Sequence, residues 1–158
     1  MEHLFDERVE EFVSCAIKNK VKMLLVGGAA VNFHGYQRHS ADLDFWIEPS
    51  EENLNKLLKT LNEIGFQVTS FPEAVKQQKQ NIAIKISPML ELELITRFSL
   101  DKSFDEAYNN KKEVIINDKT LLRWDVISYE DLIESKLKSQ RPKDLLDIQE
   151  LERINKNN

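Results

Sequence analysis

Apolar and polar residues follow helical and strand periods in turn along the chain, and the two periods predict separate elements. Apolar residues recur at helical spacing over residues 2–19, which predicts an amphipathic first helix. Residues 22–26 form a short, nearly all-apolar run, typical of a strand covered on both faces. Ser50 precedes two glutamates and a leucine repeat that stops at Gly65, which predicts a capped helix between them.

The second half of the chain predicts two hairpins and two further helices. Residues 82–86 and 89–96 read as paired strands, and in the later strand Glu91 and Glu93 share the face opposite three leucines. Residues 112–116 and 120–127 form a second strand pair of the same kind. Ser128 caps a predicted helix over residues 129–139, and Pro142 opens a final helix that buries Leu145, Ile148 and Leu151.

Candidate chemistry is concentrated between the first predicted strand and the next one. Gly27 and Gly28 follow the apolar run, and glycine lets a ligand approach the main chain closely. Residues 29–33 read as a short helix, whose free N–H groups beside the glycines suit a phosphate. Arg38 and Ser40 follow as further side chains of the kind that donate to phosphate. This stretch therefore predicts an anion site.

Two aspartates follow the anion site in a predicted strand. Asp42 and Asp44 are two residues apart, so their carboxylates share a face, while Leu43, Phe45 and Ile47 point into the core. Like charges on one face repel unless a cation lies between them, and a hard divalent ion with oxygen ligands is the natural occupant. A phosphate site beside a metal site suggests a nucleoside triphosphate that is held through its metal.

Composition narrows the class of protein without changing this picture. A chain of 158 residues fits one domain and buries roughly 70% of its unfolded surface. With 41% hydrophobic and 31% charged residues it is an ordinary globule, and a net charge of −5 provides no overall basic field for nucleic acid. A single cysteine, Cys15, excludes an internal disulfide. The acidic start and the lack of an apolar run of roughly 20 residues predict a cytoplasmic protein without a membrane partner.

Three motifs together resemble a known superfamily. G-G-A-A-V at residues 27–31, H-G-x-x-R-x-S at 34–40 and D-L-D-F at 42–45 are similar to the signature of the DNA polymerase β-like nucleotidyltransferases. Within that superfamily the chain most resembles the bacterial group related to the AbiEii abortive-infection toxins. The resemblance implies an α+β fold with a twisted mixed sheet flanked by helices. We expect one domain over residues 1–154, with an asparagine-rich, frayed tail at 155–158.

The resemblance also implies an activity and a third carboxylate. These enzymes transfer a nucleoside monophosphate from a triphosphate to an acceptor hydroxyl and release pyrophosphate. Taken alone, Glu91 and Glu93 would be solvated acids of a half-exposed strand. The family pattern matches Leu92-Glu93-Leu94-Ile95-Thr96 and selects Glu93, with Glu91 as the alternative. Asp42, Asp44 and Glu93 are therefore the predicted catalytic and metal-binding residues, with two Mg²⁺ or Mn²⁺ ions.

A motif near the C-terminus adds candidate nucleotide-binding residues. K-x-x-x-x-R-P-K-D-x-x-D at residues 136–147 resembles the same bacterial group, which implies that Lys136, Arg141, Lys143 and Asp147 face the nucleotide or the acceptor. They join Gly27, Gly28, Arg38 and Ser40 as predicted nucleotide-binding residues. Lys136 falls inside the apolar stripe of Leu132, Ile133 and Leu137, where it either extends to the edge or meets an anion. Lys143 and Asp147 are one turn apart and would also suit a surface ion pair.

The sequence leaves several alternatives open. The acceptor is a protein, a tRNA or a small molecule. The chain is either an active transferase, which would suit the toxin of a toxin–antitoxin or abortive-infection system, or an inactive nucleotide-binding relative. A third reading is an interaction module for a protein or tRNA partner. A cognate antitoxin and a homodimer formed through the first helix are the expected partners beyond the nucleotide.

Overall fold

The computed structural model describes residues 7–37, 42–115 and 123–157, and these form seven helices and six strands. The helices are α1 (Glu7–Lys18), α2 (Gly27–Phe33), α3 (Glu51–Glu63), α4 (Glu73–Lys76), α5 (Phe104–Asn109), α6 (Tyr129–Ser139) and α7 (Pro142–Lys156). The strands are β1 (Met23–Val26), β2 (Asp42–Ile47), β3 (Ile82–Ser87), β4 (Leu90–Ile95), β5 (Lys112–Ile115) and β6 (Arg123–Val126). Among these described helices, none is long and apolar enough to cross a membrane.

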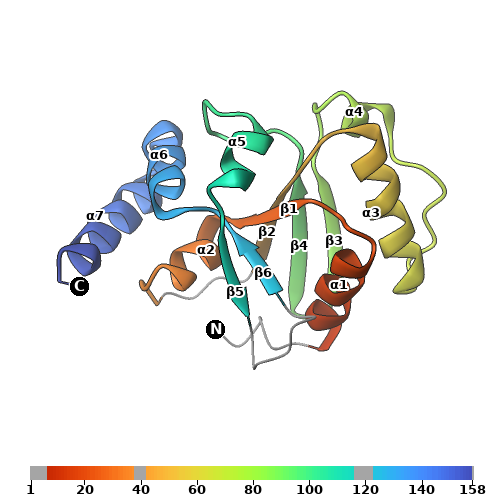
Figure 1. Ribbon diagram of the computed structural model, residues 1–158, viewed down its shortest axis with the longest axis horizontal. Coiled ribbons are helices and arrows are strands. Elements are labelled where there is room, and N and C mark those ends of the chain that lie inside the picture. The colour runs from red at the N-terminus through yellow and green to blue at the C-terminus, as the bar shows by residue number, and fades with distance from the viewer. Residues whose placement is uncertain (1–6, 38–41, 116–122, 158) are drawn as a thin grey trace.

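The six strands form one mixed sheet in the order β3-β4-β2-β1-β6-β5 (Figure 1). The two predicted hairpins, β3–β4 and β5–β6, are antiparallel and lie at the two edges of the sheet. In the middle, β1 runs antiparallel to β2 and parallel to β6, and β2 runs parallel to β4. The single domain with an α+β fold and a mixed sheet flanked by helices confirms the predicted fold class.

One face of the sheet holds the main core. Phe45 of β2 packs against Phe12 of α1 on one side and stacks on Trp124 of β6, with ring centroids 5.9 and 5.7 Å apart. The α3 helix packs beside α1 and buries Leu54, Leu57 and Leu61 (Figure 1). Because side chains alternate along a strand, the residues between these core positions lie on the opposite face.

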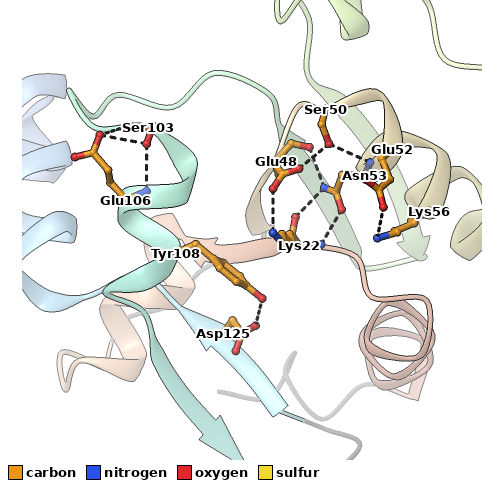
Figure 2. Close-up of polar contacts among 10 residues, drawn as sticks. All are labelled: Lys22, Glu48, Ser50, Glu52, Asn53, Lys56, Ser103, Glu106, Tyr108 and Asp125. Carbon is orange, nitrogen blue, oxygen red and sulfur yellow. Dashed lines mark hydrogen bonds and ion pairs between the residues drawn. The ribbon is translucent and has the colours of Figure 1, made fainter.

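The opposite face is covered at one end by α5. Trp46 of β2 packs against Phe104 of α5, with ring centroids 5.2 Å apart, and Tyr108 donates a hydrogen bond of 3.2 Å to Asp125 (Figure 2). Along β2 on this face, Trp46 is buried, Asp44 is half-buried and Asp42 is exposed. The aspartate end of this face of β2 is therefore less buried than its tryptophan end.

A buried asparagine fixes the ends of the two central strands. Asn53 of α3 is 3% exposed and donates to the carbonyl oxygens of Lys22 and Glu48, each at 2.9 Å, as Figure 2 shows. Its own side-chain oxygen accepts a hydrogen bond of 2.8 Å from the Lys22 amide. Since Lys22 precedes β1 and Glu48 follows β2, these bonds tie α3 to the antiparallel pair that carries Asp42 and Asp44.

The predicted helix starts are confirmed by their capping hydrogen bonds. The hydroxyl groups of Ser50 and Ser128 accept hydrogen bonds from the amides of Asn53 and Asp131. Ser103 forms a full capping box with Glu106 at the start of α5. These short-range signals lie within four residues, so they are visible in the sequence.

Two residues that were predicted to lie in the core are exposed, so these two predictions are wrong. Leu137 of α6 and Leu145 of α7 are each 52% exposed, although both were expected in buried stripes. Their helices instead bury polar residues that pair with one another, and this turns the two leucines toward solvent. The α7 helix also continues to Lys156, two residues into the segment for which a frayed tail was expected.

Candidate active site

Strand register brings the predicted carboxylates together on one face. In the parallel pair β2–β4, Asp44 lies opposite Glu93 and Asp42 lies opposite Glu91. Paired residues of neighbouring strands point to the same side of a sheet, so all four acids share the face that carries Trp46. The next strand extends both rows, because Ala83 pairs with Glu93 and Lys85 pairs with Glu91. Glu93 is thus the register partner of the more buried aspartate, and Glu91 that of the exposed one.

The glycine turn lies directly against this cluster. Gly27 has a φ of +66°, in the region that favours glycine, and begins α2 immediately after β1. A Cβ atom on Gly27 would lie 2.5 Å from Oδ2 of Asp44, closer than real contacts allow. Gly28 follows as a buried residue of α2, and its carbonyl oxygen accepts a hydrogen bond of 3.3 Å from Asn32. The main chain at Gly27 therefore lies so close to the Asp44 carboxylate that a side chain at this position would collide with it.

The surroundings of Asp44 disfavour the charged form of its carboxyl group. Burial, followed by the nearby charges of Glu93 and Asp42, raises the pKa of Asp44 to about 6. Its Oδ1 atom is buried and accepts no hydrogen bond from any described residue. A buried carboxylate oxygen without a partner, next to two like charges, is a site that a cation would stabilise.

Glu93 is held by an asparagine from the strand edge. Asn81 Nδ2 donates a hydrogen bond of 3.1 Å to Oε1 of Glu93, and Asn81 Oδ1 accepts one of 3.1 Å from the Thr96 amide. Thr96 in turn donates from its hydroxyl to the Gln80 carbonyl oxygen at 3.1 Å. Both functions of the Asn81 amide are used, so its orientation is fixed and it directs one oxygen of Glu93.

A buried ion-pair cluster joins the last two helices. The ammonium of Lys136, on a residue only 4% exposed, lies 3.1 Å from Oδ1 of Asp144 and 2.9 Å from Oδ2 of Asp147. Arg141 Nε donates to the other oxygen of Asp144 at 2.7 Å. Burial raises the pKa of Asp144, but hydrogen bonds from Arg141 and Lys136 outweigh it and lower the pKa to about 2. Lys136 thus meets its anions on α7.

Two cations at the start of α7 act on the acids of the sheet. Arg141 and Lys143, at the start of α7, are exposed, and both act on Asp44, whose pKa their charges lower. The charge of Asp44 in turn contributes to the raised pKa of Arg141, after the larger effect of its hydrogen bond to Asp144. The charges of Arg141 and Lys143 therefore act on the carboxylate cluster, although the two residues lie about 100 residues further along the chain.

The predicted site residues divide into three groups. The structure brings together Gly27, Asp42, Asp44, Glu93, Arg141 and Lys143, with Gly28 in the adjoining turn. Lys136 and Asp147 lie in the buried ion-pair cluster, where they pair with each other, so Asp147 pairs with Lys136 and not, as in the alternative interpretation, with Lys143. Arg38 and Ser40 lie outside the described residues, and their predicted contacts with phosphate stay predictions.

The acids fit a hard cation by their chemistry, but their side chains are not gathered around a single point. In the part of the chain that the structure describes, no three His, Cys, Asp or Glu residues form a group that could hold a metal ion as they lie. The buried, unpartnered oxygen of Asp44 and the two acids beside it supply oxygen ligands of the kind that Mg²⁺ takes.

Two residues of this region were not predicted as site residues. Asp144 is within the C-terminal motif, and its place one helical turn before Ile148, on the predicted buried stripe, was a signal that could have marked it as a buried acid. Asn81 comes at the end of a polar segment, and nothing local in the sequence indicates its bond to a glutamate 12 residues later. A register between β3 and β4, fixed by the hairpin turn, was the signal that could have placed Asn81 near Glu93.

Comparison with known proteins gives the family of the chain. A search of curated proteins finds no match to the chain. A family model described as "Nucleotidyltransferase of unknown function (DUF6036)" matches residues 3–158, which is nearly the whole chain. The protein therefore belongs to this family of nucleotidyltransferases.

Proposed function

We propose that the protein is a metal-dependent enzyme that transfers a nucleoside monophosphate from a nucleoside triphosphate to an acceptor hydroxyl and releases pyrophosphate. The observation that carries this proposal is the register of β2 and β4, which pairs Asp44 with Glu93 beside the Gly27 turn. Membership of a nucleotidyltransferase family supports the class of reaction.

The acids and the turn have distinct roles in this proposal. Asp42, Asp44 and Glu93 would hold Mg²⁺, and the unpartnered Oδ1 of Asp44 supports Asp44 as its central ligand. Bound Mg²⁺ would neutralise triphosphate charge and lower the pKa of the acceptor hydroxyl. The open main chain at Gly27 lets a phosphate approach next to Asp44. Arg141 and Lys143 add positive charge on the same side, which would offset the charge of the triphosphate.

The transfer itself replaces a phosphoanhydride bond of the triphosphate by a phosphoester bond to the acceptor. The acceptor oxygen forms a bond to the α-phosphorus, and the bond from that phosphorus to the oxygen bridging the α- and β-phosphates breaks. Pyrophosphate leaves with that electron pair, and the hydroxyl proton passes to a nearby carboxylate or to water. Positioning and electrostatic stabilisation are the main contributions of a protein to such a step. The fixed orientation of Glu93 by Asn81 and the close approach at Gly27 are features of that kind.

Labelled nucleotides test the reaction directly. The full chain is incubated with each of the four α-labelled triphosphates, MgCl₂ and a cell lysate, and the labelled product is identified. We expect one triphosphate to label one class of acceptor, and Asp44→Asn to reduce labelling by at least about 100-fold. Asp125→Asn is the matched control, since Asp125 is also a half-buried strand carboxylate with a raised pKa but lies beside Tyr108.

The outcomes of this assay separate the alternatives. Labelling that persists at full rate in Asp44→Asn would contradict the assignment of the site. Nucleotide binding without labelling of any acceptor would identify an inactive relative instead. Labelling of a tRNA, a protein or a small molecule would identify the acceptor class.

We propose, on the strength of the sequence motifs, a closer relation to the AbiEii group and a cytoplasmic role as the toxin of a toxin–antitoxin or abortive-infection system. The motif at residues 136–147, which resembles that bacterial group, supports this proposal. Expression of the wild-type chain in a bacterial host should then arrest growth, and Asp44→Asn should not. Equal growth of both strains at equal protein level would argue against a toxin.

A further inference from the structure

A cavity of about 470 Å³ lies along the free edge of the sheet at β3. Its walls come from the segment between α3 and α4 and from consecutive residues 80–85 of the β3 edge. Most of the lining is apolar, with Phe66, Val68 and Phe71 on one side and Ile82 and Ile84 on the other. The volume is within the range of small-molecule sites, which are typically apolar with a few polar groups.

The cavity adjoins the carboxylate cluster across a single strand. Asn81 lines the cavity and donates its side-chain hydrogen bond of 3.1 Å to Glu93. Ala83 also lines the cavity and is the register partner of Glu93 in β4. A molecule seated in the cavity would therefore have its end near Asn81 within one strand of Glu93, one of the acids that we propose as Mg²⁺ ligands.

The lining chemistry restricts what the cavity can hold. Lys85 is the one charged side chain among the described residues that line it, and Ser70, Gln80 and Asn81 are the polar ones. A nucleic acid end would bring several phosphates, which need several cations. An uncharged ring or aliphatic chain would instead bury its surface against phenylalanine, valine and isoleucine side chains. The polar residues near Asn81 are suited to a hydroxyl group at one end of such a molecule.

We propose that this cavity binds the apolar body of the acceptor, so that the acceptor is a small aromatic or aliphatic alcohol or phenol. The inference rests on the proposed nucleotidyl transfer and names its acceptor class. The hydroxyl lies at the Asn81 end of the cavity, toward Glu93, and the apolar body lies between β3 and the Phe66–Phe71 wall. The acceptor and the triphosphate then approach the acids from opposite sides, since Gly27, Arg141 and Lys143 adjoin Asp44 rather than β3.

Binding is tested with 2-phenylethanol as the probe, followed by amide chemical shifts of the full ¹⁵N-labelled chain. We expect saturable shifts confined to residues 66–75 and 80–85. Ser70→Trp and Gln80→Trp fill the cavity from exposed positions on its two walls and should abolish these shifts. Gln67→Trp places the same ring at an exposed neighbouring residue that does not line the cavity and should leave them intact. Absent shifts, shifts elsewhere, or shifts that persist in both filled variants would overturn the inference.

Transfer with labelled nucleotide separates this inference from the proposed function. We expect Ser70→Trp to raise the KM for the lysate acceptor by at least about tenfold and Gln67→Trp to leave it unchanged. Normal transfer by Ser70→Trp to the same acceptor would overturn the inference alone. Absence of transfer by the wild-type protein would overturn the proposed function, and with it the role of the cavity as an acceptor site.

Discussion

Gly27 and Asp44 are in contact across the β1–β2 pair, with no room between them for a single added carbon. A Cβ on Gly27 would lie 2.5 Å from Oδ2 of Asp44, and the Gly27 backbone is in the left-handed region at φ +66°. Two independent features thus favour glycine at this position, and one of them concerns the carboxylate itself. The turn that follows β1 is therefore part of the geometry of the acid cluster.

Replacing Gly27 by alanine should disturb the acid more than the fold. Gly27→Ala and Gly65→Ala both force alanine into positive φ, which costs roughly 1–2 kcal/mol of unfolding free energy. Gly65 serves as the matched control, because a Cβ there meets nothing within 4 Å. We expect Mn²⁺ affinity, measured by calorimetry, to fall in Gly27→Ala and to stay at the wild-type value in Gly65→Ala. Equal affinities in the two variants would show that the contact with Asp44 is unimportant.

Asn81 should support cation binding through Glu93. Without the side chain of Asn81, Oε1 of Glu93 loses the 3.1 Å hydrogen bond that orients it. Loss of such a supporting partner typically lowers metal affinity 10- to 100-fold, and we expect a drop of about this size in Asn81→Ala. Asn62→Ala is the control, because Asn62 bonds only backbone groups of Leu58 and Val68 among its described partners. A Mn²⁺ affinity unchanged in Asn81→Ala would rule out this supporting role.

Asp144 should make stability depend on pH in acid. Hydrogen bonds from Arg141 and Lys136 hold the pKa of Asp144 at about 2 despite burial, below the usual aspartate value of 3.8. Between these values the unfolded chain binds more protons, so stability rises with pH. The contribution, roughly 2 kcal/mol, is fully present above about pH 4 and is lost as pH falls through about 2. We expect the difference in unfolding free energy between wild type and Asp144→Asn to shrink over this range.

The Asp144 measurement has a surface ion pair as its control. Removal of one member of a buried ion pair costs about 3 kcal/mol near neutral pH, because the remaining charge stays buried. Glu150→Gln breaks an exposed pair with Arg153, with atoms 2.9 Å apart, and should cost less than about 1 kcal/mol. Urea unfolding at pH 7, 5, 4, 3 and 2.5 gives both values at each pH. A difference between wild type and Asp144→Asn that stays constant from pH 5 to 2.5 would contradict the pKa of Asp144.

Lys143 should contribute to triphosphate binding by its charge. It is exposed, and its charge lowers the pKa of Asp44, so it faces the site without supporting the core. We expect Lys143→Gln to weaken binding of a non-hydrolysable triphosphate with Mg²⁺ by about three- to tenfold, with a smaller loss at high salt. Lys138→Gln removes a lysine of α6 that pairs with Asp101 at the surface, and should leave affinity unchanged. Equal affinities for both variants would remove Lys143 from the site.

The strand chemistry of the site could be predicted because it depends on alternation. Asp42 and Asp44 share a face whatever their neighbours are, and the same holds for Glu91 and Glu93. That β4 lies beside β2, parallel and with Asp44 opposite Glu93, depends on a crossover between distant segments. The periodicity of either strand contains no information about that pairing. The motif resemblance supplied the expectation of a third acid, and the register gives its location.

The last two helices show what local periodicity misses. The position of Lys136 in an apolar stripe correctly indicated an unusual environment, but its partners, Asp144 and Asp147, come from α7. Their approach depends on the turn at Gln140, which has a left-handed φ of 54° and ends α6. With the ion pairs at the centre of the contact between the helices, Leu137 and Leu145 turn outward. A stripe drawn from apolar residues alone could not show this rotation.

The location of bound Mn²⁺ is the most direct test of the account. Mn²⁺ broadens the amide signals of nearby residues, so a titration of the ¹⁵N-labelled full chain maps the ion without any assay of activity. We predict that residues 26–28, 42–44 and 92–94 lose their signals first, and that Asp44→Asn abolishes this selectivity. Broadening centred on another part of the chain, or unchanged in Asp44→Asn, would contradict a cation site formed by Asp42, Asp44 and Glu93.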